Sequence, residues 1–143
     1  LQERSEGRFQ NAIPEIDVIP AEGVQRVVRC SGKVYYDLLE ARRKADNKAV
    51  AIIRIEQLYP FPEEELKEIM QPYQHVQDFV WCQEEPKNQG AWYNCQHRMK
   101  RVIPAGTYLN YVGRPASAAP AVGYMSLHLQ QQKTLVEEAL TIK

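Results

Sequence analysis

The hydrophobic positions of this chain alternate between strand-like runs and helix-like stripes. Residues 24–30 form a mainly apolar run, and residues 34–45 then carry apolar side chains at the spacing of one helix face. Residues 49–55 are an almost continuous apolar run, which is typical of a strand buried on both faces of a parallel sheet. This first half of the pattern predicts a strand, a helix and a second, central strand.

The alternation continues to the end of the chain. Proline and three acids at 62–65 indicate a first helical turn, and Pro72 ends that helix. Residues 76–82 and 108–112 are predicted strands, and residues 92–103 between them have helical spacing. A last helix, capped by Ser126 and running to about Ile142, is expected to pack through Leu129, Val136, Ala139 and Leu140.

Strands that alternate with helices predict an α/β fold with a mostly parallel sheet of about five strands, flanked by helices. Residues 1–22 carry two prolines and many charges, so we expect an extended lead-in or linker there. Residues 23–143 are expected to form the α/β domain. Within it, the charged cluster Arg42-Arg43-Lys44 is expected on the solvent side of its helix, near the carbonyl end that favours cations.

Composition limits the possible partners. The 143 residues suffice for one domain, and 44% apolar with 25% charged residues is ordinary for a globular protein. Lys plus Arg and Asp plus Glu are 18 each, so no net field attracts nucleic acid or an anionic membrane, and we expect neither as a partner. The chain begins with Leu1 and has no leader-like start, as expected of a fragment of a longer protein.

The cysteines and histidines predict no metal site. Cys30, Cys82 and Cys95 form no CxxC pair, and the three histidines do not fall at metal-ligand spacing with them. Buried thiols in a reducing compartment are the favoured interpretation. Nucleophilic triads and glycine-rich phosphate loops are absent from the sequence as well, so we expect no complete active site.

Open α/β sheets bind ligands at the carboxyl ends of their strands. Ser31-Gly32-Lys33 follows the first strand. We expect a tight turn capped by Ser31 there, and the alternative is a site where backbone N–H groups bind an anion. Glu84-Glu85 is expected just past a strand end. One of the two is expected to form a structural ion pair with Arg114, and the alternative is a carboxylate that faces a partner or ligand.

Residues 113–123 carry one charge, so we expect an ordered loop packed on its own domain or on an interface, and both remain open. Trp92 and Tyr93 are interpreted as core aromatics rather than interface anchors. The candidate interface or anion contacts are Ser31, Lys33, Glu84, Glu85, Gln89, Trp92, Arg114 and Ser117.

Several segments resemble the C-terminal domain of the decarboxylase component of 2-oxoglutarate dehydrogenase. They are CSGKVYYD at 30–37, RIEQLYPFP at 54–62, FVWCQEEP at 79–86, NQGAW at 88–92, GRPAS at 113–117 and PAVGYM at 120–125. The resemblance covers about residues 24–143 and is closest to the bacterial enzyme with a single long decarboxylase chain.

This resemblance implies a transketolase-like C-terminal domain. It implies a bacterial, cytoplasmic parent that uses thiamine diphosphate and Mg²⁺ to decarboxylate 2-oxoglutarate and passes the succinyl group to the lipoyl arm of its succinyltransferase partner. In this family the active site lies between two upstream domains, so no catalytic, cofactor-binding or metal residue is expected here. The C-terminal domain is expected to contact those upstream domains and to support the homodimer.

Two other interpretations stay open at this point. One is the equivalent domain of another thiamine enzyme, a pyruvate dehydrogenase or a transketolase, which the run from Glu84 to Trp92 disfavours. The other is a freestanding regulatory module for acyl-CoA or nucleotide anions. Some relatives bind such regulators near this domain, and Ser31, Lys33 and Arg114 are the positions that would then matter.

Overall fold

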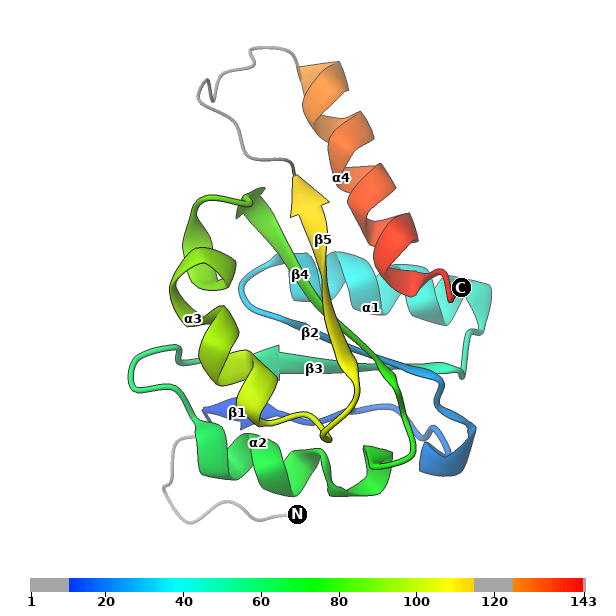
Figure 1. The fold of residues 1–143 in the computed structure, drawn as a ribbon. Helices are drawn as coiled ribbons and strands as arrows, with labels where there is room; N and C mark the ends of the chain where they lie inside the picture. Colours follow the sequence, from blue (N-terminus) through cyan, green and yellow to red (C-terminus); the bar gives the residue numbers. More distant parts are fainter. Residues whose placement is uncertain (1–10, 115–124, 143) are drawn as a thin grey trace.

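The computed structural model describes residues 11–114 and 125–142, which form one sheet with helices on both faces (Figure 1). The sheet has five strands in the order β1-β3-β2-β4-β5; β1 is antiparallel to β3, and the other pairs are parallel. The predicted mostly parallel α/β architecture is therefore confirmed. The elements are β1 (Ala12–Ile13), η1 (Ala21–Gly23), β2 (Arg26–Cys30), α1 (Val34–Ala45), β3 (Val50–Ile55), α2 (Glu63–Ile69), η2 (Gln71–Tyr73), β4 (Asp78–Pro86), α3 (Gly90–Arg101), β5 (Tyr108–Arg114) and α4 (Met125–Leu140).

The two faces of the sheet bury two separate apolar clusters because side chains alternate along each strand. On one face, Val27 and Trp81 pack with residues of α2 and α3. On the other face, Val28 and Ile52 pack with residues of α1 and α4. The central strands β2 and β3 are thus covered on both sides, which explains their nearly continuous apolar sequence.

The order of the strands creates a switch point between β2 and β4. From β2 the chain passes through α1 to β3 on one side, and β4 lies on the other side of β2. Helix α1 packs into one apolar cluster and α3 into the other, so the helices that follow these two adjacent strands cover opposite faces. Open α/β sheets form crevices at such points, at the carboxyl ends of the strands.

Two strands extend further than predicted. Strand β4 continues to Pro86, so Glu84 and Glu85 lie within the strand and not past its end. Strand β5 continues to Arg114, so residues 113–114 belong to the sheet. The two strands pair along this length, from Asp78 opposite Tyr108 to Pro86 opposite Arg114. Hydrogen bonds between them satisfy the backbone groups of the last residues, whose polar sequence did not indicate a strand. The rest of the predicted loop, 115–123, lies outside the described residues.

Helix α4 packs through its C-terminal half. Val136 and Ala139 are buried and Leu140 is partly buried, as predicted, but Leu129 is 59% exposed. Leu135 is buried instead. Figure 1 shows the reason, since the first turns of α4 extend beyond the sheet. The helix begins at Met125, so Ser126 lies in its first turn rather than at the predicted capping position, and the Ser126 side chain is outside the described residues.

The predicted lead-in joins the sheet where the structure describes it. Strand β1 pairs with the end of β3. Asn11 donates from its side chain to Glu65 Oε1 on α2 at 3.0 Å and from its backbone N–H to Glu65 Oε2 at 3.2 Å. Further along, Glu15 Oε1 accepts the N–H of Ile52 at 2.8 Å. Residues 11–15 therefore cover the edge of β3, which would otherwise present unpaired backbone groups.

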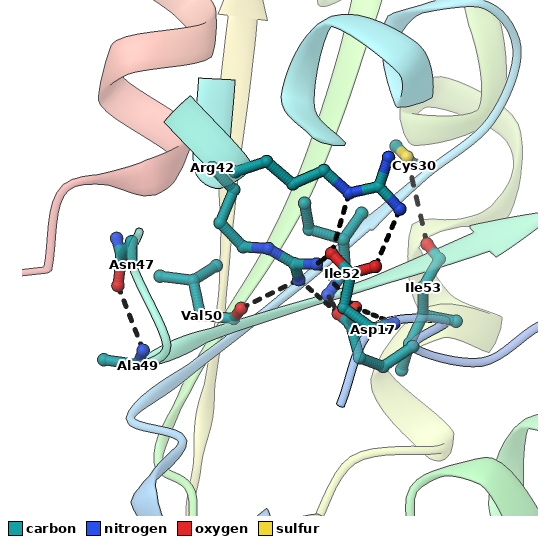
Figure 2. A network of polar contacts seen from close by, with 10 residues as sticks. Asp17, Cys30, Arg42, Asn47, Ala49, Val50, Ile52 and Ile53 are labelled. Atoms are coloured by element: carbon teal, nitrogen blue, oxygen red, sulfur yellow. Dashed lines mark hydrogen bonds and ion pairs between the residues drawn. The ribbon is translucent and has the colours of Figure 1, made fainter. Parts of the chain in front are cut away.

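A buried arginine holds this segment to α1. The Arg42 guanidinium donates to both carboxylate oxygens of Glu15, to Asp17 Oδ2 at 2.6 Å and to the carbonyl of Val50 at 3.2 Å (Figure 2). Arg42 is 2% exposed, so the prediction that it lies on the solvent side of α1 is wrong. Its charge is compensated by two carboxylates that lie far away in the sequence, in the lead-in. We call Glu15, Asp17, Arg42 and Arg43 the clasp.

The clasp predicts a specific acid sensitivity. A hydrogen bond from Arg43 lowers the pKa of Asp17 from 3.8 to about 2, against the effect of burial and with help from Arg42. Because the pKa of Asp17 is lower in the folded state, its ionised carboxylate stabilises the fold at pH values above the unfolded-state pKa of 3.8. This contribution is lost as the pH falls through about 2.

We expect Asp17→Asn to remove this part of the pH dependence. Between pH 4 and pH 2 the free energy of unfolding should fall less steeply in the variant than in the parent. Urea denaturation at several pH values measures the difference. Asp46→Asn is the matched control, because Asp46 is exposed and meets Lys48 at 3.4 Å. Identical slopes for Asp17→Asn and the parent would contradict the assignment.

The three cysteines are buried and free, as predicted. Burial raises the pKa of Cys82 to about 12 and raises that of Cys30 as well, so neither thiol is poised as a nucleophile at neutral pH. Within the described part of the chain, no helix is long and apolar enough to cross a membrane.

Candidate functional site

Polar side chains from several elements meet at the carboxyl edge of the sheet, beside the switch point. Gln132 of α4 connects two of them: its Oε1 accepts from Arg114 Nη2 at 2.9 Å, and its Nε2 donates to Asp37 Oδ2 on α1 at 2.8 Å. Glu84 on β4 and Lys33, just before α1, are close enough to interact electrostatically. We call Lys33, Asp37, Glu84, Arg114 and Gln132 the carboxyl-edge cluster.

Glu84 is the half-buried acid of this cluster. Burial raises the pKa of its carboxyl group above the usual value, and the negative charges of Asp37 and Glu85 act in the same direction. Lys33 and, more weakly, Arg114 oppose the shift. A carboxylate in such mixed surroundings can receive a cationic or hydrogen-bonding group from a partner that completes its environment.

The predicted ion pair of Arg114 with a glutamate is not found among residues 11–114 and 125–142. Strand β5 directs the Arg114 side chain towards α4, where Gln132 accepts its hydrogen bond. The backbone carbonyl of Arg114 accepts from the Tyr111 hydroxyl at 2.7 Å. The contact between β5 and α4 thus explains the difference from the prediction.

The turn at Ser31-Gly32-Lys33 is confirmed as a tight turn. Gly32 has a φ of 82°, which favours glycine, and the N–H of Tyr35 bonds to the Gly32 carbonyl at 3.3 Å. Lys33 occupies the capping position of α1, with no side-chain cap there, so the predicted cap by Ser31 is wrong. Lys33 is exposed and Ser31 half-buried, both at the carboxyl end of β2.

Gln83 organises the other half of this edge. Its Oε1 accepts from the indole of Trp81 at 2.9 Å and from the backbone of Trp92 at 3.0 Å. Its Nε2 donates to the carbonyls of Glu85 and Pro86, each at 3.0 Å, and of Gln89 at 2.9 Å. One buried side chain therefore shapes the whole turn from β4 into α3.

Gly90 makes this close arrangement possible. It has a φ of 70°, and a Cβ at this position would lie 3.2 Å from Gln83 Oε1. A side chain there would be strained in conformation and crowded against the amide of Gln83. The predicted Asn88-Gln89-Gly90 turn is confirmed, and the glycine explains how it opens α3.

Three sequence-predicted site residues surround Gln83 rather than the carboxyl-edge cluster. Glu85 and Gln89 are exposed and present their carbonyls to Gln83. Trp92 is half-buried, and its ring centroid lies 5.4 Å from that of Tyr111. Tyr93 is 65% exposed, so its interpretation as a core aromatic is wrong. Ser117 lies outside the described residues.

Three residues of this edge, Gln83, Asp37 and Gln132, were not predicted from the sequence. Gln83 carried a usable signal, because it follows Trp81 at the spacing of one strand face in an otherwise buried run, and a buried amide must be hydrogen-bonded. Asp37 and Gln132 carried none. Asp37 lies at an exposed helix position and Gln132 at a half-buried one, and they meet only because α1 packs beside α4.

A groove continues from the cluster along α1 and α4. It has a volume of about 810 Å³, and its lining includes the apolar Ala41, Val136 and Leu140 together with Asp37 and Gln132. A smaller hollow of about 260 Å³ is lined by Arg114 and by residues of α4. The cluster is thus bordered by two concave surfaces.

The carboxyl-edge cluster presents charged and hydrogen-bonding groups that can bind a partner. The described residues hold no group of three or more His, Cys, Asp or Glu that could bind a metal ion. The charged groups of the cluster lie on helices and strands at the edge of a fully packed sheet, where they can meet a complementary protein surface. The fold and the site together define an α/β domain with a polar, charged cluster at the carboxyl edge of its sheet.

Comparison with known proteins identifies the fold and the family of this domain. A solved split-gene transketolase, described as an inactive beta4 tetramer, has the same fold, with a TM-score of 0.56 and 18% identity; the match covers 92% of this chain and 48% of that one. The family model described as "2-oxoglutarate dehydrogenase C-terminal" matches residues 1–140, and the chain belongs to this family.

The curated relatives agree with this assignment. The chain is 62% identical over 141 residues to a 2-oxoglutarate dehydrogenase E1 component of Haemophilus influenzae and 53% identical over 145 residues to that of Azotobacter vinelandii. Each match covers 99% of this chain and 15% of the relative, so the chain spans about a seventh of their length. These relatives give no support to a freestanding regulatory module.

Proposed function

We propose that this chain is the C-terminal support domain of the first, decarboxylating component of a 2-oxoglutarate dehydrogenase. The observation that carries the proposal is the match to the family's C-terminal model over residues 1–140, in a chain that spans 15% of its E1 relatives. The parent subunit oxidatively decarboxylates 2-oxoglutarate and transfers the succinyl group to a lipoyl group. The chain contributes a folded contact surface to that subunit.

The cofactor of the parent belongs elsewhere in the subunit. The family resemblance assigns thiamine diphosphate and Mg²⁺ to the parent, and Mg²⁺ prefers oxygen ligands such as carboxylates. The residues described here contain no group of three or more His, Cys, Asp or Glu side chains that could hold a metal ion. We place thiamine diphosphate and Mg²⁺ in upstream domains of the parent subunit.

The partners follow from the same proposal. The carboxyl-edge cluster is the surface that contacts upstream domains of the same subunit or a second copy in the homodimer. Its mixed charges, with Lys33 and Arg114 near Glu84 and Asp37, suit a polar interface with fixed register. The lipoyl-bearing succinyltransferase is a partner of the assembled parent, in the bacterial cytoplasm.

Activity measurements test the proposal. We expect the purified 143-residue chain to release no CO₂ from 2-oxoglutarate, because it spans only 15% of the length of its E1 relatives. The full subunit that carries the chain should lose dimerisation and activity when residues 24–143 are deleted. Release of CO₂ by the chain alone, or a fully active dimer without it, would each overturn the support role.

A double substitution in the full subunit locates the surface. Lys33→Glu with Arg114→Glu should weaken the oligomer in analytical ultracentrifugation, since like charges would then gather around Glu84. Lys44→Glu with Lys48→Glu is the matched control, because both lysines are exposed and lie outside the cluster. Equal assembly in the two double variants would exclude the cluster from the interface.

A further inference from the structure

Helix α3 carries a cluster of cations that the fold itself does not use. Its last turn contains Arg98, Lys100 and Arg101, all of them exposed, and the helix contains no acid. Within the described part of the chain, none of the three forms an ion pair or a side-chain hydrogen bond. Because the whole chain has a net charge of zero, the excess of cations on this helix is balanced by acids elsewhere in the chain.

The nearest acidic helix does not neutralise this charge. Helix α2 packs beside α3 and begins with three glutamates. Glu65 accepts hydrogen bonds from Asn11, and Glu64 lies 3.8 Å from Lys67 of its own helix. Cations at the end of a helix are favoured by the helix dipole, which accounts for one or two of them. It does not account for the exposed aromatic side chains around them.

Two exposed tyrosines border the cations. Tyr93 is 65% exposed and lies on the helix face that also carries His97 and Arg101, at intervals of four residues. Tyr59 is 61% exposed and comes from the loop between β3 and α2. The pKa of Tyr59 is raised chiefly by the nearby Cys95 thiol and lowered by Asn94 and Arg98, so its hydroxyl lies beside α3.

We propose that this surface, Tyr59, Tyr93, Arg98, Lys100 and Arg101, docks an acidic segment of another polypeptide. Tyrosine and arginine are the residue types enriched at protein–protein interfaces. The three cations span four residues of one helix, about 5 Å along its axis, which matches a short run of carboxylates. Binding of nucleic acid depends on neutralising many backbone phosphates, for which three cations on a chain of zero net charge are few. The proposal does not depend on the activity of the parent.

A binding titration of the chain tests this surface. The probe is a fluorescein-labelled peptide, Asp-Glu-Glu-Tyr-Glu-Asp-Glu-Leu, added to the purified protein in dilute salt. We expect saturable binding that weakens as NaCl is raised, because screening shortens the range of the attraction. In ¹⁵N spectra the shifted amides should lie in Tyr93–Arg101 and near Tyr59.

Matched charge reversals decide the outcome. Arg98→Glu/Lys100→Glu/Arg101→Glu should weaken peptide binding roughly tenfold or more. Lys44→Glu/Lys48→Glu/Lys133→Glu changes the net charge equally on exposed positions away from α3 and should bind like the parent. Circular dichroism confirms that both fold. No saturable binding by the parent, equal weakening in both variants, or tighter binding of a DNA duplex or of phosphatidylserine vesicles would overturn the proposal.

Discussion

Arg42→Met is expected to destabilise the domain by about 3–5 kcal/mol, the typical effect of removing one partner from a buried ion pair. The substitution keeps an unbranched side chain in the core but leaves Glu15, whose side chain is 6% exposed, beside Asp17 without their shared cation. It also removes a donor from the carbonyl of Val50. Urea denaturation followed by tryptophan fluorescence measures the loss in the free energy of unfolding.

A second buried arginine supplies the matched control. Arg29 is fully buried, and its Nη2 donates to the carbonyl of Met99 at 3.2 Å, but its Nε and Nη1 have no hydrogen-bond partner among the described residues. Burial lowers its pKa to about 10, and no acid among the described residues compensates its charge. Arg29→Met should therefore stay within about 1 kcal/mol of the parent or stabilise the domain, since burying an apolar group in place of an incompletely satisfied charge is often favourable.

The two arginines separate charge compensation from packing. Equal destabilisation by Arg42→Met and Arg29→Met would contradict the role of the clasp and point to lost packing instead. A further variant, Arg42→Met with Glu15→Gln and Asp17→Asn, removes the uncompensated carboxylates and should recover part of the loss. The difference from the sum of the single effects is the coupling energy of the clasp.

Gln83→Leu is expected to cost about 2–4 kcal/mol and to loosen the turn into α3, since each buried polar group left unpaired costs about 1–3 kcal/mol. Leucine has nearly the same volume but bonds neither the indole of Trp81 nor the backbone of Trp92. The backbone carbonyls at the end of β4, which lose the Gln83 donor, can bond to water instead, and this limits the loss in the free energy of unfolding. Hydrogen exchange should become faster at the Trp92 amide, whose only protein acceptor among the described residues is Gln83.

Gln96→Leu is the control for this substitution. Gln96 lies half-buried on α3, and its side chain makes no hydrogen bond within the described residues. We expect little change in stability and unchanged exchange at Trp92. If Gln83→Leu left both the urea midpoint and the Trp92 exchange rate unaltered, the hydrogen bonds of Gln83 would not be what orders this edge.

Local sequence pattern predicted the regular elements well, for a physical reason. Residues 49–55 were predicted as a buried strand, and the structure forms Val50–Ile55 because both faces of that strand are covered. The predicted turn at Ser31-Gly32-Lys33 depends on the conformational freedom of Gly32, a property of that one residue. Apolar periodicity and turn residues act over a few positions, so the sequence displays them directly.

The carboxyl-edge cluster was predictable in part. Parallel strands bring their carboxyl ends to one edge, so Lys33, Glu84 and Arg114 could be expected near each other before the fold was known. The hydrogen-bond partners of these residues could not be predicted from the sequence. Arg114 meets Gln132 because α4 returns across β5, and no local pattern reports where a later helix will cross.

What the sequence determined by itself is therefore the α/β class, the position of the central strands and helices and, through its specific segments, the family. Tertiary structure alone decided that Arg42 is buried and that the lead-in closes the edge of β3. The partners of Arg42 lie 25 and 27 residues earlier in the chain, in a segment whose own apolar pattern is weak. Compensation of a buried charge depends on three-dimensional proximity, and a one-dimensional pattern does not contain that information.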